Sequence, residues 1–177
     1  MQSTFAVRRF TSNEWRTYKE LRLRALGDSP DAFGSTLAAE QVSTDEQWSA
    51  RLTRGVMSNA DLPLVAEVSG RSVGLAWAKI DESEQSVVHL YQMWVAANFR
   101  RRGAGQMLLY AAIAWAKASS AEAIVLGVSC GDTAASRLYA RAGFIPVGPP
   151  EPLRAGSPVL AQAMRLVLSA HEPRRPD

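Results

Sequence analysis

A glycine-containing basic turn near the middle of the chain joins a strand-like run to a helix-like run. Over residues 100–106 its sequence is Arg-Arg-Arg-Gly-Ala-Gly-Gln. The run before it, 87–95, is rich in β-branched and aromatic residues, and the run after it, 107–116, contains helix formers without a breaker. A turn that opens a helix leaves backbone N–H groups unpaired at the positive end of the helix dipole, and neighbouring arginines add forked donors. This arrangement predicts a binding site for a phosphate or pyrophosphate.

Periodicity and turn residues predict the remaining elements. Two capping boxes, Thr11–Glu14 and Ser43–Glu46, indicate the starts of two helices, and the first helix ends at Gly27-Asp28-Ser29-Pro30. The segment 31–41 between them is expected to be irregular. Further helices are expected over residues 103–118 and 132–142, the second capped by Asp132 or Thr133. Strands are expected over residues 5–10, 64–68, 73–80, 87–95, 123–128, 144–147 and 159–168.

The order of these elements constrains the topology. It is β-α-α-β-β-β-α-β-α-β-β, in which the strand over 87–95, a helical crossover and the strand over 123–128 imply one parallel pair. The rest of the sheet is expected to be antiparallel. Because the 177 residues contain no repeat or linker, we expect one domain over residues 1–170, followed by a disordered tail over 171–177.

Composition argues against several kinds of site and partner. Cys130 is the single cysteine, and His89 and His171 are the two histidines, so neither a disulfide framework nor a metal site is expected. No apolar run reaches the roughly 20 residues of a membrane span, and the first residues lack a signal-peptide pattern, which favours the cytoplasm. The net charge of +3 is compatible with nucleic-acid binding, but acidic residues are interspersed through most of the chain. We therefore expect neither a nucleic acid nor a membrane as the partner.

Two sequence blocks together resemble a known family. The first, Val95-x4-Arg100-x-x-Gly103-x-Gly105, is similar to the acetyl-CoA signature of the GNAT N-acetyltransferase superfamily. The second, over residues 132–144, resembles that family's Asn-x-x-Ala-x-x-x-Tyr-x-x-x-Gly-Phe segment. The resemblance implies a mixed α/β (α+β) fold: a mainly antiparallel sheet of about seven strands, flanked by about four helices, with a splayed parallel strand pair.

The resemblance also implies a cofactor and the residues that hold it. The cofactor is acetyl-CoA without a metal, its pantetheine arm bonding the freed backbone of residues 93–95 and its pyrophosphate bonding the amides of 101–106. Glycine lacks Cβ, so Gly103 and Gly105 let a ligand approach the main chain. The implied cofactor-binding residues are Met93, Trp94, Val95, Arg100, Arg101, Arg102, Gly103, Ala104, Gly105, Gln106, Asp132 and Tyr139.

Two proton transfers complete the implied reaction, in which an amine attacks the thioester directly in a ternary complex. Tyr139 matches the tyrosine that protonates the departing thiolate, and His89 matches a glutamate that serves as general base in some members. Each has a purely structural alternative: Tyr139 as a core aromatic, and His89 as a partly buried strand histidine. Other members carry a carboxylate at the position of Gly127, which cannot serve as a base, and Asp132 replaces the family's asparagine.

Alternative functions and the acceptor remain open at this stage. A non-catalytic acyl-CoA-binding module on the same scaffold is one alternative, and a nucleic-acid-binding protein using the arginine cluster is another. In the segment that lines the acceptor side in the family, Asp28, Asp31 and Ser35 either receive a cationic group or cap and solvate a loop. The acceptor is an amine of a small molecule or a peptide, and a homodimer is possible.

Overall fold

The computed structural model describes residues 4–168 and contains eight strands and five α-helices in that range. The expected tail, 171–177, lies outside the described residues. The strands are β1 (Phe5–Arg9), β2 (Asp61–Val68), β3 (Arg71–Ile80), β4 (Val87–Val95), β5 (Ala123–Ser129), β6 (Ile145–Pro146), β7 (Glu151–Pro152) and β8 (Leu160–Val167). The helices are α1 (Trp15–Asp28), α2 (Leu37–Glu40), α3 (Asp45–Met57), α4 (Ala104–Ala118) and α5 (Ala134–Arg141), with 3-10 turns η1 (Ser12–Glu14), η2 (Pro30–Ala32) and η3 (Ala97–Phe99).

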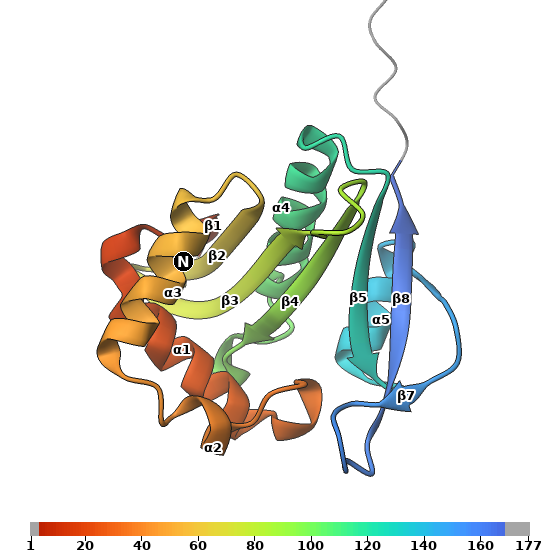
Figure 1. Ribbon diagram of the computed structural model, residues 1–177, viewed down its shortest axis with the longest axis horizontal. Helices are drawn as coiled ribbons and strands as arrows, with labels where there is room; N and C mark the ends of the chain where they lie inside the picture. The colour runs from red at the N-terminus through yellow and green to blue at the C-terminus, as the bar shows by residue number, and fades with distance from the viewer. Residues whose placement is uncertain (1–3, 169–177) are drawn as a thin grey trace, which may run out of the picture.

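The strands form one twisted sheet in the order β1-β2-β3-β4-β5-β8-β6, with β7 also paired to β8 (Figure 1). The pair β4–β5 is parallel and all other pairs are antiparallel. Helix α4 makes the crossover between the parallel strands, as the strand–helix–strand order predicted. The expected fold is therefore confirmed, with eight strands in place of about seven and five helices in place of about four.

Three local expectations differ from the structure. The segment 31–41 is not irregular throughout, because it contains η2 and α2. Helix α3 is capped by Thr44, whose side chain accepts from the Gln47 N–H, and not by Ser43 with Glu46. By contrast, α5 is capped by Thr133, one of the two caps expected, whose side chain accepts from the Ser136 N–H. Strand β7 was not predicted within its proline- and glycine-rich loop.

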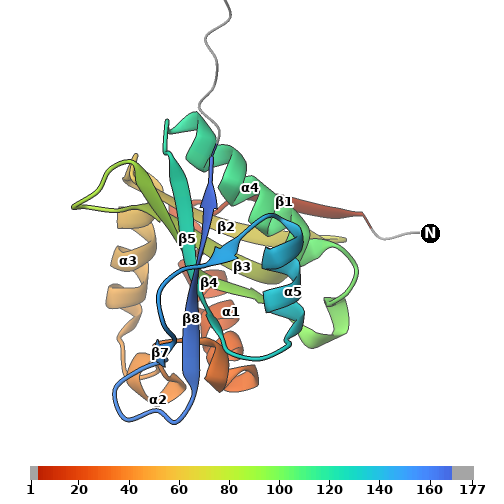
Figure 2. The ribbon, with the colours of Figure 1, turned by 90° about the vertical axis from the view of Figure 1, so that its right-hand side faces the viewer.

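The sheet is covered on both faces, by different helices (Figure 2). On the α1/α3 face, α1 and α3 pack over β2 and β3 around the fully buried Tyr18, Trp48 and Leu52. On the α4/α5 face, α4 crosses β1 to β4 with the buried Leu108, Leu109 and Ala112 toward the sheet, and α5 lies against β5. Burial on both faces explains why the inner part of β2 is apolar without alternation. The helices leave the α1/α3 face of β5 and β8 uncovered (Figure 1).

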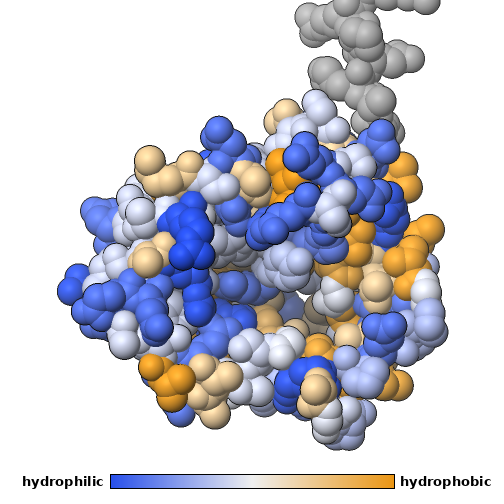
Figure 3. Space-filling model, in the orientation of Figure 1, coloured by the Kyte–Doolittle hydropathy of each residue, from blue (hydrophilic) through white to orange (hydrophobic). Residues whose placement is uncertain are grey.

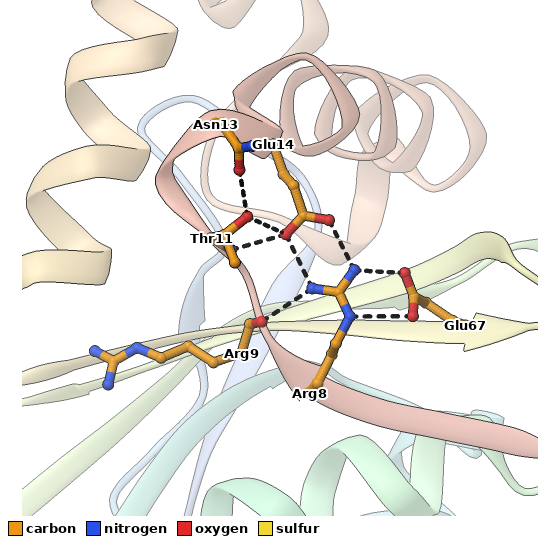
Figure 4. A network of polar contacts seen from close by, with 6 residues as sticks. All are labelled: Arg8, Arg9, Thr11, Asn13, Glu14 and Glu67. Atoms are coloured by element: carbon orange, nitrogen blue, oxygen red, sulfur yellow. Dashed lines mark hydrogen bonds and ion pairs between the residues drawn. The ribbon is translucent and has the colours of Figure 1, made fainter.

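An arginine-centred network joins the first strand to the first helix (Figure 4). The Arg8 guanidinium donates to both carboxylate oxygens of Glu67, at 2.7 and 3.1 Å, and to both of Glu14, at 2.7 and 2.9 Å. Glu14 also accepts from the Thr11 N–H at 2.8 Å, which completes the capping box predicted from the sequence. The hydrogen bonds from Arg8 lower the pKa of Glu14 to about 2.

This network predicts a pH-dependent contribution to stability. Glu14→Gln should lower the free energy of unfolding at pH 7 by about 1–2 kcal/mol, since the partly exposed, charge-assisted contacts with Arg8 are lost while the Gln oxygen can still accept from the Thr11 N–H. A carboxylate whose pKa is lower in the folded state stabilises the fold only while it is ionised. The difference between wild type and variant should therefore be complete above the ordinary pKa of 4.5 and vanish as the pH falls toward about 2. Urea titrations across this range measure it, with the exposed Glu84→Gln as control; a pH-independent difference contradicts the assignment.

Candidate cofactor and acceptor site

The parallel strands β4 and β5 separate part way along their length. Their pairing ends at Leu90 and Leu126, beyond which β4 pairs only with β3 and β5 pairs only with β8. The backbone of β4 from Tyr91 to Val95 therefore has no strand partner on its β5 side within the described residues. This separation is the splayed parallel pair that the resemblance implied.

A bulge in β4 accompanies the separation. Leu75 pairs with Trp94 and Trp77 with Tyr91, so β4 has two residues, Gln92 and Met93, where β3 has one. Gln92 is left-handed, with φ of 57°, and its Oε1 accepts from the hydroxyl of the buried Tyr18 at 3.0 Å. The bond to α1 supports a backbone conformation that a non-glycine residue adopts at a cost. Gln92 and Tyr91 thus both lie on the α1/α3 face, whereas simple alternation would separate them.

Next to this opening, α4 begins with a run of unpaired amides. We call residues 101–106 the amide loop. Within residues 4–168, none of its six backbone N–H groups has a protein acceptor, and the first capping bond of the helix runs from the Met107 N–H to the Gly103 carbonyl at 3.0 Å. Gly103 has φ of 95° and supplies no capping side chain. Free amides at a helix N-terminus provide donors and positive potential for an anion, as the sequence predicted.

The amide loop lies against the end of β4 and against α5. A Cβ at Gly105 would lie 3.6 Å from Leu138 Cδ2, 3.7 Å from Met93 Cε and 3.9 Å from Val95 Cγ2. The first turn of α4 is therefore within van der Waals distance of both the splayed part of β4 and α5. The structure brings together residues 93–95 and 101–106 of the predicted site.

The side chains of Arg100 and Trp94 contact α1. Arg100 Nε donates to the Val95 carbonyl at 2.8 Å, and its Nη2 donates to the Asp28 carboxylate. Asp28 also accepts from the Trp94 indole N–H at 2.9 Å. These bonds, the one from Trp94 above all, hold the pKa of Asp28 below its ordinary value. Asp28 is thus bound to Arg100 of the same chain. Sequence patterns could not indicate this contact, because the two residues are far apart in the chain.

Tyr139 lies in the core cluster of the α4/α5 face. The residue is 6% exposed and its ring packs against Phe144, 5.9 Å away between centroids. Within the described chain its hydroxyl has no hydrogen-bond partner, and burial raises its pKa to about 12. The core cluster also contains Val95, and Met93 packs against it. By contrast, Asp132 is exposed and accepts from Arg137 Nη1 at 2.6 Å.

His89 lies on the opposite, α1/α3 face of β4, paired with Lys79 and Val125. Its Nε2 lies 2.9 Å from Asp81 Oδ2, and its ring stacks on Tyr91 at 5.7 Å between centroids. Asp81 Oδ1 accepts from the Ser83 hydroxyl and from the backbone N–H groups of Ser83 and Glu84, which strongly lowers its pKa. The carboxylate therefore holds the imidazole in place while about a third of the side chain stays exposed.

A hollow opens on this face between the part that carries α1 and α3 and the part formed by β5 and β8 (Figure 3). Gly127 of β5 pairs with Ala163 of β8, and both are exposed. A Cβ added to Gly127 would meet no atom within 4 Å. This part of β5 and β8 is therefore open on its surface.

No group of three or more potential metal ligands occurs among the described residues. Over the same range, no helix is both long enough and apolar enough to cross a membrane.

Solved structures of other proteins share the fold of this chain, whereas a search of curated proteins gave no match. Among solved structures, a GNAT acetyltransferase of Streptococcus pneumoniae superposes with a TM-score of 0.78 at 20% identity, covering 94% of this chain and 100% of its own. The acetyltransferase yncA of Salmonella typhimurium, solved with its cofactor acetyl-CoA, gives 0.77 at 20% identity, covering 99% of both chains. A spermidine N-acetyltransferase of Vibrio cholerae, in complex with CoA and spermine, gives 0.75 at 16% identity, covering 92% and 95%.

These structures share the fold of the chain, and the sequence itself shows the family. The model of the Acetyltransferase (GNAT) family matches residues 19–144, which include β4, the amide loop, α4 and α5. The chain belongs to the GNAT family of acetyltransferases.

Proposed function

We propose that the protein is an acetyl-CoA-dependent N-acetyltransferase that transfers an acetyl group to a primary amine. The observation that carries the proposal is the amide loop, with six unpaired N–H groups, beside the splayed end of β4. The amides of residues 101–106, with the exposed Arg101 and Arg102, suit a diphosphate. Arg100 offers no free donor of this kind, since its guanidinium is bound to Asp28 and its N–H donates to the Ala97 carbonyl. The backbone of 93–95 would hold the pantetheine arm.

Acetyl-CoA supplies an acyl group already activated as a thioester. The amine nitrogen forms a bond to the acyl carbon, the carbon–sulfur bond breaks, and the amine loses a proton while the sulfur gains one. Backbone N–H groups near Val95 would polarise the carbonyl, and orientation of the two reactants supplies much of the rate. We propose Tyr139 as the group that gives the proton to sulfur, because its raised pKa keeps the hydroxyl protonated.

His89 is the proposed base for the amine. It lies on the α1/α3 face, on the side of the sheet opposite the core that contains Tyr139. The contact with Asp81 at Nε2 leaves Nδ1 as the nitrogen available to accept a proton, directly or through a water. Asp132, whose carboxylate is bound to Arg137, is the weakest of the proposed cofactor contacts.

The experiment that tests the function combines calorimetry with acetyl-CoA and thiol release over a panel of amines. Binding together with amine-dependent thiol release is the expected result, and His89→Gln should slow release while leaving acetyl-CoA affinity unchanged. Binding without release for any amine would indicate a non-catalytic acyl-CoA-binding module. Absence of binding, with salt-sensitive retention on a polyanion, would indicate a nucleic-acid-binding protein.

A further inference from the structure

An ionic cluster joins the helices α1, α2 and α3 on the α1/α3 face of the sheet. Arg22 of α1 donates through Nε and Nη2 to Glu40 of α2, with contacts from 2.6 to 3.2 Å. Arg51 of α3 donates to the second oxygen of the same carboxylate at 3.0 Å. The side chains of Arg22 and Glu40 are 5% and 11% exposed, and that of Arg51 is 38% exposed. One carboxylate therefore faces two guanidinium groups, leaving one excess positive charge.

One guanidinium donor of the cluster is buried without an acceptor. Arg22 Nη1 is buried without a hydrogen-bond partner in the described residues. Arg51 donates through Nη1 to Glu40 and also contacts the Tyr18 hydroxyl, and with 38% of its side chain exposed it is the member of the cluster that a ligand can reach. The buried Arg22 donor without an acceptor is unfavourable, and an oxyanion bound at Arg51 would add the negative charge that the cluster lacks.

Contacts connect Arg51 to the bulge. Its guanidinium lies over the Trp48 ring at 4.5 Å and beside the Tyr18 hydroxyl, where its charge opposes the rise in the Tyr18 pKa that burial causes. The same hydroxyl donates to Gln92 at the bulge. Arg51 is thus two contacts from the place where β4 leaves β5, on the face that the acceptor would occupy.

The other charged groups on this face are mostly paired. Asp28 is bound to Arg100 and Glu82 to Lys79, whereas Asp81 contacts His89, whose proposed role as a base requires a neutral imidazole, so Asp81 keeps its negative charge. Arg165 of β8 pairs with Val125, the β5 residue that pairs with His89, and has no ion-pair partner in the described residues. The exposed Asp31 lies on η2, which contacts β5, and the exposed Glu151 of β7 pairs with Ala161 of β8. The excess positive charge is therefore local to the Arg22–Glu40–Arg51 cluster, where a carboxylate is favoured over a further cation.

We infer that the acceptor is a small amino acid, in which a carboxylate near the reacting amine binds Arg51. The inference rests on the proposed function and gives its substrate class. Guanidinium and carboxylate form paired hydrogen bonds, so the same contact would hold the acceptor and orient its amine toward the bulge. A polyamine, whose charges are all positive, lacks the group that this contact requires.

The test compares kcat/KM for a panel of L-amino acids with that for their C-terminal amides, which retain the amine and lose the carboxylate. Wild-type protein should prefer an acid over its amide by about tenfold or more, the effect of one charge-assisted hydrogen bond. Arg51→Gln should remove most of this preference by lowering kcat/KM for the acids, while kcat/KM for the amides should change less than about twofold. Arg51→Lys should restore part of it, and Arg54→Gln, an exposed arginine of the same helix, should leave both rates unchanged.

Equal or faster turnover of the amides, of spermidine or of longer peptides would overturn the inference, and this comparison does not depend on any variant folding. If no amine releases thiol, the proposed function fails, and a separate measurement still decides the acceptor class. Calorimetry of the amino acids with the coenzyme A complex should then show binding that is weaker for the amides and for Arg51→Gln. Equal binding of acids and amides would contradict the inference.

Discussion

Replacing Gly103 with aspartate is expected to weaken acetyl-CoA binding by at least about a hundredfold. Gly103 caps α4 with φ of 95° and lies among the six unpaired amides of the amide loop. The new carboxylate would bring a negative charge to the amides proposed to hold the diphosphate, and it could itself accept their hydrogen bonds. Loss of one or two charge-assisted hydrogen bonds costs about 3 kcal/mol, which is about a hundredfold in affinity. Isothermal titration calorimetry with acetyl-CoA measures the effect.

The matched control for this variant is Gly70→Asp. Gly70 lies in the β2–β3 turn with φ of 74°, and, as at Gly103, a Cβ there would meet no atom within 4 Å. Both substitutions place aspartate in the left-handed region, so both should lower stability by a similar amount of about 1 kcal/mol. Only Gly103→Asp should lose acetyl-CoA binding. If the two variants bind acetyl-CoA equally well, the amide loop is not the diphosphate site.

Removing the Tyr139 hydroxyl is expected to lower kcat by about a hundredfold while leaving acetyl-CoA affinity within about twofold. General acid catalysis contributes about 10²- to 10⁴-fold, and a thiolate is a good leaving group, so the lower end applies. Stopped-flow or steady-state thiol release measures kcat, and calorimetry measures affinity. The raised pKa, about 12, keeps the hydroxyl protonated through the mildly alkaline range. Ionisation of Tyr139 should therefore not limit activity at pH 9.

The structure separates this catalytic loss from a loss of folding. The Tyr139 hydroxyl has no hydrogen-bond partner among the described residues, so Tyr139→Phe breaks no internal bond and should melt within a few degrees of wild type. Tyr110→Phe, at an exposed position of α4, provides the control and should retain full kcat. Unchanged turnover in Tyr139→Phe would leave Tyr139 as a core aromatic, the alternative that the sequence also allowed.

Elements with a strong local signal were predicted closely. The strand expected over 87–95 is β4 with the same ends, and the helix expected from 103 to 118 is α4. The weak elements were not predicted: α2 has four residues and β7 has two, too few for a period to be detected. At the start of α3, Ser43–Glu46 and Thr44–Gln47 both fit a capping box, and local sequence could not choose between them.

The amides of the candidate site were predictable, but the use of its side chains was not. Arg100 was predicted to bind the cofactor because it precedes the glycines, yet its guanidinium is held by Asp28, 72 positions away in the chain. The partner of Gln92 at the bulge, Tyr18, is 74 positions away. Sequence patterns describe neighbours within a few residues, and these contacts form only when α1 packs on the sheet.

Local backbone preferences were enough to predict the longer elements and the glycine turn that leaves amides free, and the order of those elements in turn implied the parallel strand pair. Tertiary structure decided where the strands part, which arginine is available to a ligand, and which charges gather on the acceptor face. Arg22, Glu40 and Arg51 come from three different helices. Their shared charge exists only after those helices pack together, because electrostatic pairing depends on distance in space and not on separation along the chain.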